Sequence, residues 1–290
     1  MKQSAEKGAH NFIARIVNVA VASGFEVEYR PNTAGERAAS ANLPGYAMFH
    51  MNEPTHDRAM TMRRVYYYPF WQIERSGKRW EWRVAHAQFD AAQIDQAEAQ
   101  RFFTFWRKRL FGEVGEVGSG GLVYVPLQGR LTEHRSFQTC SPIEMIEAVL
   151  EHDPNRRVVA TLHPGESYTD REIATLERLE KQHSRLQIES GQMEKWLAAC
   201  DYVVTQNSSA AFAGFFFQKP CITFARIDFH HISAHVPNLG RAKAFAQVLG
   251  DAPDYAAYIW WFLQEMSINA GRPEAEAKIN AALLRGGWPM

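Results

Sequence analysis

Short apolar runs alternate with amphipathic segments through the second half of the chain. The apolar runs have the length of strands and are bounded by turn residues or polar clusters. They span residues 122–127, 157–162, 186–189, 202–205 and 221–224. The segments between them have helical spacing and span residues 142–150, 170–183, 192–199 and 208–217. Strands that alternate with helices predict βαβ crossovers and a parallel sheet, so we expect an α/β fold with a Rossmann-like domain here.

The beginning of the chain predicts one helix and one short strand. Residues 11–23 place apolar side chains on one helical face, and Gly24 follows as a residue that ends helices. Residues 25–29 alternate between apolar and polar, which predicts a strand. The usual opening strand of an α/β domain would precede His10, but residues 1–8 are too polar to form it. Either this strand is missing from the reading frame or the N-terminal domain is reduced.

The middle of the chain has a weaker pattern. Residues 46–90 are aromatic and β-like without a clear period, and we assign no elements there. Residues 90–110 predict a long helix whose last turn is basic, which suits the helix dipole. The glycine-rich residues 112–121 are the best linker in the sequence, and we place a domain boundary inside them. Two helices, over 253–269 and 273–284, are expected to close the chain.

Composition and charge exclude several classes of protein. Lys and Arg together number 32, as do Asp and Glu, which argues against a strongly basic nucleic-acid groove. The three cysteines are widely spaced and form no metal pattern, so we expect reduced thiols in the cytoplasm. The most apolar stretch, residues 210–217, is far shorter than the ~20 residues of a membrane span. An ordinary globular protein is therefore expected.

Polar residues follow three of the expected strands at the point where each strand ends. In an open parallel sheet, ligands bind in the crevice at the carboxyl ends of the strands. The candidate nucleotide-binding residues there are Gln128, His163, Pro164, Gln206, Asn207, Ser208 and Ser209. The last three lead into a helix, whose first N–H groups lack internal partners and form a prepared phosphate site. Taken singly, Ser208 is also explained as a helix cap and His163 as a partner of a neighbouring loop.

The joint pattern is more specific than its parts. LVYVPLQ at 122–128, the His-Pro pair at 163–164 and TQNSSAAFAGFFFQKPCIT at 205–223 together resemble the C-terminal half of capsule polysaccharide biosynthesis proteins, the Kdo transferases. The pattern is also similar to bacterial GT-B sialyltransferases, which hold a cytidine nucleotide with an HP and a Ser-Ser/Thr motif. The resemblance covers about a third of the chain.

This resemblance implies a GT-B-like fold, in which two Rossmann-like domains face a cleft and the N-terminal one is reduced or irregular. The expected division has an acceptor-side α/β domain over 1–115 and a nucleotide-sugar-binding domain over 116–252. Residues 253–290 are expected to form C-terminal helices that pack across both domains.

The implied activity is transfer of a sugar to a surface polysaccharide or glycolipid. The donor would be Kdo or a related acidic sugar activated by CMP, and the site would use no metal and no further cofactor. The implied partners are the nucleotide sugar and a glycan acceptor, with no nucleic acid. The implied location is cytoplasmic, and a peripheral contact with the inner membrane or a capsule assembly complex is left open.

Two positions depart from the family pattern. Ala213 stands where the family has a Glu that commonly binds the nucleotide ribose, and Gln218 stands where it has a Gly. A non-catalytic nucleotide- or sugar-binding accessory homologue of the same pathway is therefore the alternative function.

A GT-B transferase also needs a base or an electrostatic partner, normally from the N-terminal domain. Three candidates are His10, Glu53 and Glu133. His10 begins the first expected helix, where several GT-B enzymes keep a catalytic histidine. Glu53 lies in the polar segment NEPTHDR, and Glu133 follows the strand at 122–127. A surface or capping role is the alternative for each of the three.

A histidine-rich segment follows the strand at 221–224. His231 and His235 are four residues apart, and with Asp228 they suggest a zinc site on one helical face. Pro237 argues against a helix there. We therefore expect His230 and His231 to lie in a polar loop on the rim of the nucleotide cleft, without a metal.

Overall fold

The computed structural model describes residues 2–113 and 117–290, which form two compact units. Unit 1 comprises Met1–Ala87 and Trp261–Met290, and unit 2 comprises Gln88–Trp260. This division differs from the one expected at residues 115/116 and 252/253, and residues 114–116 lie outside the described part. Helix α5 (Gln96–Phe111) belongs to unit 2 because its Phe103 ring stacks on Phe216, with 5.7 Å between centroids.

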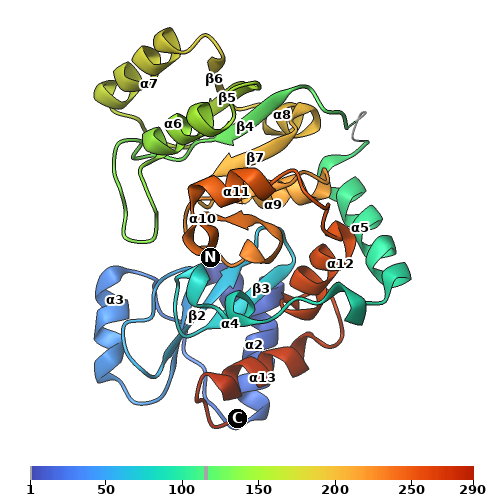
Figure 1. Cartoon of the computed structure of the whole chain (residues 1–290). Coiled ribbons are helices and arrows are strands. Elements are labelled where there is room, and N and C mark those ends of the chain that lie inside the picture. The colour runs from blue at the N-terminus through green and yellow to red at the C-terminus, as the bar shows by residue number, and fades with distance from the viewer. Residues whose placement is uncertain (1, 114–116) are drawn as a thin grey trace. The chain divides into compact units, whose positions relative to one another are not determined.

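Unit 2 contains a six-stranded sheet in the order β6-β5-β4-β7-β8-β9, and all of its strands are parallel (Figure 1). The strands are β4 Leu122–Pro126, β5 Arg157–Leu162, β6 Leu186–Ser190, β7 Tyr202–Thr205, β8 Cys221–Thr223 and β9 Ala234–His235. The chain moves outward from β4 through β5 to β6 and then returns to the other side of β4 with β7. The order is that of a doubly wound, Rossmann-type domain. The parallel sheet and its first five strands confirm the prediction.

The helices of unit 2 are α5, α6 Pro142–His152, α7 Asp170–Gln182, α8 Met193–Ala199, α9 Ser209–Phe216, α10 Val236–Leu239, α11 Arg241–Gln247 and α12 Tyr255–Trp260, with 3-10 turns η3 Ala91–Gln93 and η4 His230–Ile232. Helices α6, α7, α8 and α9 follow the sequence pattern, whereas α10, which begins just before Pro237, and α11 were not predicted. Ser141 and Glu144 form a capping box at α6, and Thr169 and Glu172 form one at α7. The capping residues explain why these helix starts could be read from the sequence.

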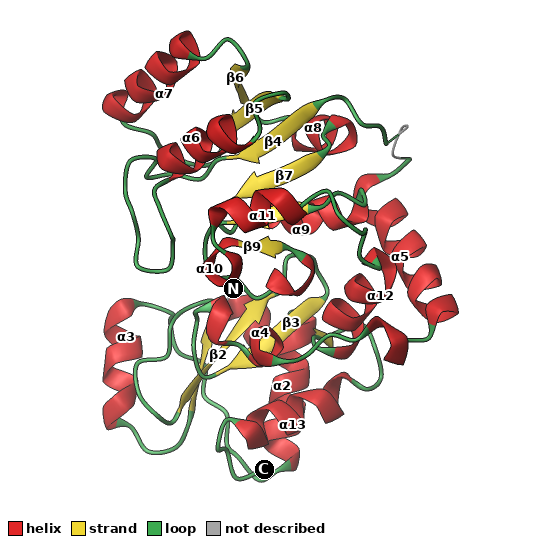
Figure 2. Ribbon diagram, viewed as in Figure 1, coloured by secondary structure: helices red, strands yellow, loops and turns green. Residues whose placement is uncertain are grey.

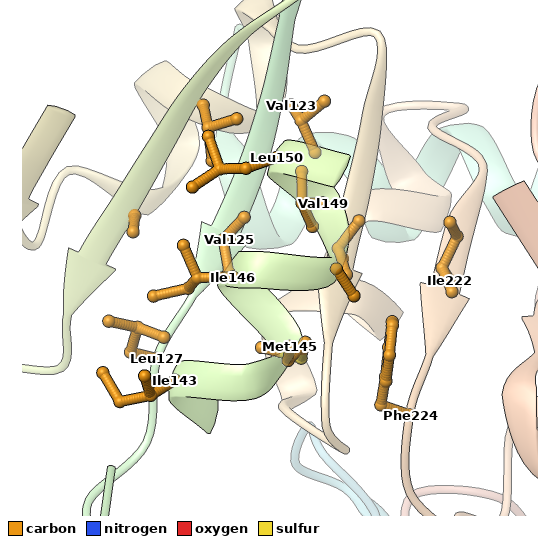
Figure 3. Packing of buried hydrophobic residues seen from close by; sticks show 14 of the residues in the cluster. Val123, Val125, Leu127, Ile143, Met145, Ile146, Val149, Leu150, Ile222 and Phe224 are labelled. Atoms are coloured by element: carbon orange, nitrogen blue, oxygen red, sulfur yellow. The ribbon is translucent and has the colours of Figure 1, made fainter. Parts of the chain in front are cut away.

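Helices cover both faces of this sheet because its strands are apolar on both sides. On one face, Val123 and Val125 of β4 pack with Ile146 and Val149 of α6 in one buried cluster (Figure 3). On the other face, α8 and α9 contact β4 and β7. Gly214 of α9 lies so close to Leu197 and Val203 that an added Cβ would meet them at 3.4 and 3.5 Å.

Unit 1 contains a smaller mixed sheet in the order β1-β2-β3-β10, and Figure 2 labels its strands β2 and β3. Its strands are β1 Ala47–His50, β2 Ala59–Arg64, β3 Phe70–Glu74 and β10 Ile268–Asn269. Strands β1 and β2 are parallel, and the other two pairs are antiparallel. The helical elements are α1 Lys2–Glu6, α2 Asn11–Ala22, α3 Ala34–Ala39, η1 Ser40–Asn42, η2 Arg79–Glu81, α4 Arg83–His86, the π-helical turn η5 Trp261–Glu265 and α13 Ala275–Arg285. This irregular sheet matches the expectation of a reduced N-terminal domain.

Three predictions for single elements are wrong. Residues 25–29 form no strand, because no strand of the sheet pairs with them. The helix expected over 90–110 begins only at Gln96, because Asp95 caps it. The helix expected over 253–269 ends at Trp260, and the π-helical turn and strand β10 follow it.

The glycine-rich stretch is bound to unit 2 over residues 117–121. The Gly120 N–H donates to the Ala199 carbonyl at 2.8 Å. The Lys219 ammonium donates to the Gly118 carbonyl at 2.6 Å and to the Cys200 carbonyl at 2.6 Å. These residues therefore do not act as a free linker. Across the described residues, no helix combines the length and the apolar character that crossing a membrane requires.

Candidate functional site

The candidate site lies where the strand order of unit 2 reverses, between β4 and β7. Both strands are parallel, so their carboxyl ends, at Pro126 and Thr205, lie on one edge of the sheet. The Thr205 hydroxyl donates to the Pro126 carbonyl at 3.3 Å and joins the two ends. Ligands of open α/β sheets bind in the crevice that such a reversal creates.

The loop after β4 contributes one predicted residue to this edge. Gln128 is half-buried, and its Oε1 has no hydrogen-bond partner within the described residues. The next residue, Gly129, packs closely against the loop after β5, since an added Cβ would lie 2.7 Å from Glu166 Oε2. The loops after β4 and β5 therefore meet at the same edge.

Glu172 of α7 holds the loop after β4 in place. Its carboxylate accepts hydrogen bonds from the Leu131 N–H and from the N–H and hydroxyl of Thr169. Burial acts to raise the pKa of Glu172, but these hydrogen bonds outweigh it and lower the pKa overall. The ionised carboxylate thus joins the capping of α7 to the position of the β4 loop.

His163 and Pro164 follow β5, the strand next to β4. The His163 backbone N–H donates to the Tyr168 hydroxyl at 2.8 Å, and His163 Nδ1 accepts from the Gly165 N–H at 3.0 Å. Because Nδ1 is the acceptor, the neutral ring carries its proton on Nε2. The exposed ring therefore offers an N–H donor to a ligand at this edge.

The loop after β7 leads directly into α9. Gln206 is almost fully buried, and its Nε2 donates to the Cys140 carbonyl at 2.9 Å. Ser208 Oγ accepts from the Ala210 N–H at 3.2 Å and is the N-cap of α9. Asn207 is half-buried and Ser209 is exposed, and neither side chain has a hydrogen-bond partner in the described part of the chain. Ser208 therefore caps α9, whereas the Ser209 hydroxyl is available to a ligand.

The site brings the two motifs together on one edge, on either side of β4. His163 follows β5 and Asn207 follows β7, and both strands flank β4 in parallel. We expected His163 and Asn207 to lie at the same end of the sheet, and placement at opposite ends would have excluded a shared site. Ala213, at the position of the family Glu, is buried in α9 with 1% exposure. It offers no carboxylate to a ribose.

The histidines after β8 form a stacked cluster. The ring centroids of His230 and His231 are 4.5 Å apart, and those of His230 and His235 are 5.0 Å apart. His235 Nδ1 lies 2.9 Å from Thr223 Oγ1, and His231 Nδ1 lies 3.0 Å from the Tyr258 hydroxyl. Desolvation by burial, and then the two neighbouring histidines, lower the pKa of His235 to about 3. The His235 ring is therefore neutral at pH 7.

The zinc arrangement considered for this segment is not formed. Residues His230–Ile232 are a 3-10 turn and β9 follows, so His231 and His235 share no helical face. Among residues 2–113 and 117–290, no group of three His, Cys, Asp or Glu side chains is placed to hold a metal ion.

The three candidate bases lie in different surroundings. His10 caps α2, since its Nδ1 accepts from the Ile13 N–H at 3.3 Å. Glu53 accepts from the Gly77 N–H at 2.6 Å and the Ser76 hydroxyl at 3.2 Å, so it holds a loop of unit 1. Glu133, in the loop after β4, pairs with Arg130 at 3.3 Å in an exposed position.

His50, at the end of β1, is a titratable residue that the sequence pattern did not indicate. Its ring centroid lies 6.1 Å from that of His10 and 6.0 Å from that of Trp71. Desolvation by burial, and then His10 and neighbouring arginines, lower the pKa of His50. The only signal in the sequence was its place at the end of the run AMFH, within the segment to which no element was assigned.

Similarity to known proteins was found at the level of structure and not of sequence. No family model and no curated protein matches this chain. The structure is similar to Thermosulfurimonas dismutans KpsC, a beta Kdo 2,7 transferase, with a TM-score of 0.52 and 13% identity over 94% of this chain and 95% of that one. It is also similar to WaaG, a glycosyltransferase involved in lipopolysaccharide biosynthesis, with a TM-score of 0.39 and 13% identity over 80% of this chain and 57% of that one. The likeness to KpsC confirms the predicted GT-B-like α/β fold.

Proposed function

We propose that this protein is a glycosyltransferase. It binds a nucleotide-sugar donor between β4 and β7, where the strand order of unit 2 reverses. The observation that carries the proposal is the convergence of His163 and the α9 N-terminus on the edge that flanks β4. The proposed donor is Kdo or a related acidic sugar linked to CMP. The proposed acceptor is a surface polysaccharide or glycolipid, reached in the cytoplasm by peripheral contact with the inner membrane or a capsule assembly complex.

The residues at this edge suit a phosphate group. His163 Nε2–H, the Ser209 hydroxyl and the first N–H groups of α9 are donors, and the helix dipole adds partial positive charge. An acceptor hydroxyl attacks the anomeric carbon while the bond from that carbon to the phosphate oxygen of CMP breaks. The donors stabilise the charge that collects on the phosphate.

The proton of the acceptor hydroxyl passes to a base. In the tautomer set by the Ile13 N–H, His10 carries its proton on Nε2 and has no free lone pair. The Glu53 carboxylate is engaged by Ser76 and Gly77, whereas Glu133 is exposed and has one ionic partner. We therefore rank Glu133 ahead of the other two.

A binding experiment tests the donor site. Calorimetric titration with CMP, UDP and GDP should give the tightest binding for CMP. Loss of one hydrogen bond to a charged phosphate weakens binding by about 1.5–3 kcal/mol, so His163→Ala should raise the Kd for CMP by about 10- to 100-fold.

His183→Ala is the matched control, because His183 is an exposed histidine that precedes β6, at the opposite edge of the same sheet. It should leave the Kd unchanged. Equal affinities of His163→Ala and wild type for CMP, with both proteins folded, contradict the proposed site.

The alternative, a non-catalytic binding homologue, is favoured by one observation. Ala213 is buried at the position of the family Glu, so no carboxylate at that position holds the ribose. Release of CMP from CMP-Kdo in the presence of a glycan acceptor separates the two functions. Binding of CMP without any release would favour the accessory role.

A further inference from the structure

Unit 1 contains a cavity, partly open to solvent, that the proposed donor site does not use. Its volume is about 510 Å³, and it lies between α2, residues 25–32, α3 and β1. Sites for small molecules have volumes of about 300–1,000 Å³. The cavity is therefore large enough for an organic ligand, and far larger than the space that one water molecule fills.

The cavity arises where the expected strand fails to form. Strand β1 is at the edge of its sheet and pairs only with β2. Residues 25–32 run past this edge, and the Asn32 side chain donates to the His50 carbonyl at 2.9 Å. Because no ladder draws residues 25–29 onto the sheet, space remains between them and β1.

The wall of the cavity that α2 and β1 form is apolar. Helix α2 contributes Ile13, Ile16 and Val17, and β1 contributes Met48 and Phe49. All five side chains are buried or half-buried in this structure. They form an apolar wall that suits a hydrocarbon chain, whereas the polar and charged lining residues lie within residues 26–40 and at His50.

Apolar side chains also remain open to solvent at the entrance. Val27 is 40% exposed and Tyr46 is 37% exposed, and both line the cavity. Phe25 and Tyr46 pack around Trp288, with ring centroids 6.0 and 5.1 Å from it. An apolar ligand that covers this patch removes apolar surface from water, which lowers the free energy of the complex.

The charged residues on the rim disfavour an anionic ligand. Arg30 pairs with Glu28 at 3.1 Å and with Glu36 at 3.4 Å, and both carboxylates line the cavity. Arg37 donates to the Asn32 carbonyl at 2.9 Å. With Glu26 added, three carboxylates outnumber the two guanidinium groups, so the net negative charge of these rim residues disfavours a phosphate or carboxylate.

We propose that this cavity binds an uncharged aliphatic chain, such as the alkyl or acyl part of a neutral amphiphile. The site is separate from the proposed nucleotide site, since all of its lining residues belong to unit 1. It would give the chain an affinity for neutral lipid-like molecules that does not depend on any transferase activity.

Fluorescence of the uncharged dye N-phenyl-1-naphthylamine tests the site in the full chain. The dye should bind saturably with one site per chain, and 1-decanol should displace it. The decanoate anion should displace it at least about 10-fold less well, because of the acidic rim. CMP should not displace it. Absence of saturable dye binding, or equal displacement by decanoate, overturns the proposal.

Two matched variants place the dye in the cavity. Val17→Phe fills the cavity and should weaken dye binding at least about 10-fold. Val21→Phe makes the same change one turn later on α2, at a side chain that is 56% exposed and outside the cavity, and should leave binding unchanged. Leu43→Phe, in a loop of the cavity wall, should reproduce the effect of Val17→Phe if that variant folds poorly. Unchanged binding in both filled variants overturns the proposal.

Discussion

The two adjacent serines at the start of α9 allow capping and ligand binding to be separated by single substitutions. Ser208 is buried, and its hydroxyl accepts from the Ala210 N–H at 3.2 Å. Ser209 is the first residue of the helix and is exposed, without a side-chain partner in the described residues. A cap residue acts on the free energy of unfolding, whereas a free hydroxyl beside the helix N-terminus acts on the ligand.

The two substitutions are expected to change different quantities, namely the free energy of unfolding and the affinity for CMP. Ser208→Ala removes an N-cap and should lower the free energy of unfolding by about 1 kcal/mol. Ser209→Ala should leave the free energy of unfolding within about 0.5 kcal/mol of wild type, as exposed substitutions do. It removes one charge-assisted hydrogen bond to phosphate, worth about 1.5–3 kcal/mol, and so should weaken CMP binding by about one to two decades.

Urea unfolding without ligand and calorimetric titration with CMP measure both quantities on each variant. Ser209→Thr keeps the hydroxyl and should bind CMP nearly as wild type does. The reasoning is refuted if Ser209→Ala binds CMP as tightly as wild type. It is equally refuted if Ser209→Ala loses as much stability as Ser208→Ala, because Ser209 would then be the cap.

Three further predictions concern unit 2. Since the pKa of His235 is lowered to about 3 in the fold, its contribution to stability should be complete above about pH 6.5. Below about pH 6.5 the free energy of unfolding should fall by roughly 1.4 kcal/mol per pH unit because of His235. Urea unfolding of His235→Asn at several pH values should not show this slope. Glu172→Ala leaves the buried Leu131 N–H without its acceptor and should lower the free energy of unfolding by about 2 kcal/mol in urea titrations. Gly120→Ala places a Cβ 2.7 Å from a backbone carbonyl and should lower the melting temperature, whereas Gly118→Ala enters open space and should not.

The sheet of unit 2 was predictable because its information is local. The first five strands are short apolar runs, and the starts of α6 and α7 carry the caps Ser141 and Thr169. The polar residues after the strands followed, since parallel strands bring their ends to one edge. His163 and Asn207 therefore reached the same edge without any knowledge of long-range contacts.

The elements that failed depend on partners distant in sequence. Residues 25–29 alternate as a strand does, but alternation alone supplies no neighbouring strand. Residues 268–269 form a strand only because Phe70 and Trp71, nearly two hundred residues earlier, pair with them. Packing decided these cases, and a single sequence does not show it.

The assembly of unit 1 from both parts of the chain has a consequence for synthesis. Strand β10 pairs with β3, the Asn11 side chain donates to the Ala270 carbonyl at 3.0 Å, and α13 packs on α2. A ribosome delivers residues 88–260 before residues 261–290, so unit 2 is complete while unit 1 still lacks these contacts. The apolar cluster that contains Trp71 and Ile73 still lacks Ile268, Ile279 and Leu283 during this interval. The N-terminal segment is therefore the part of this protein that a co-translational chaperone would hold.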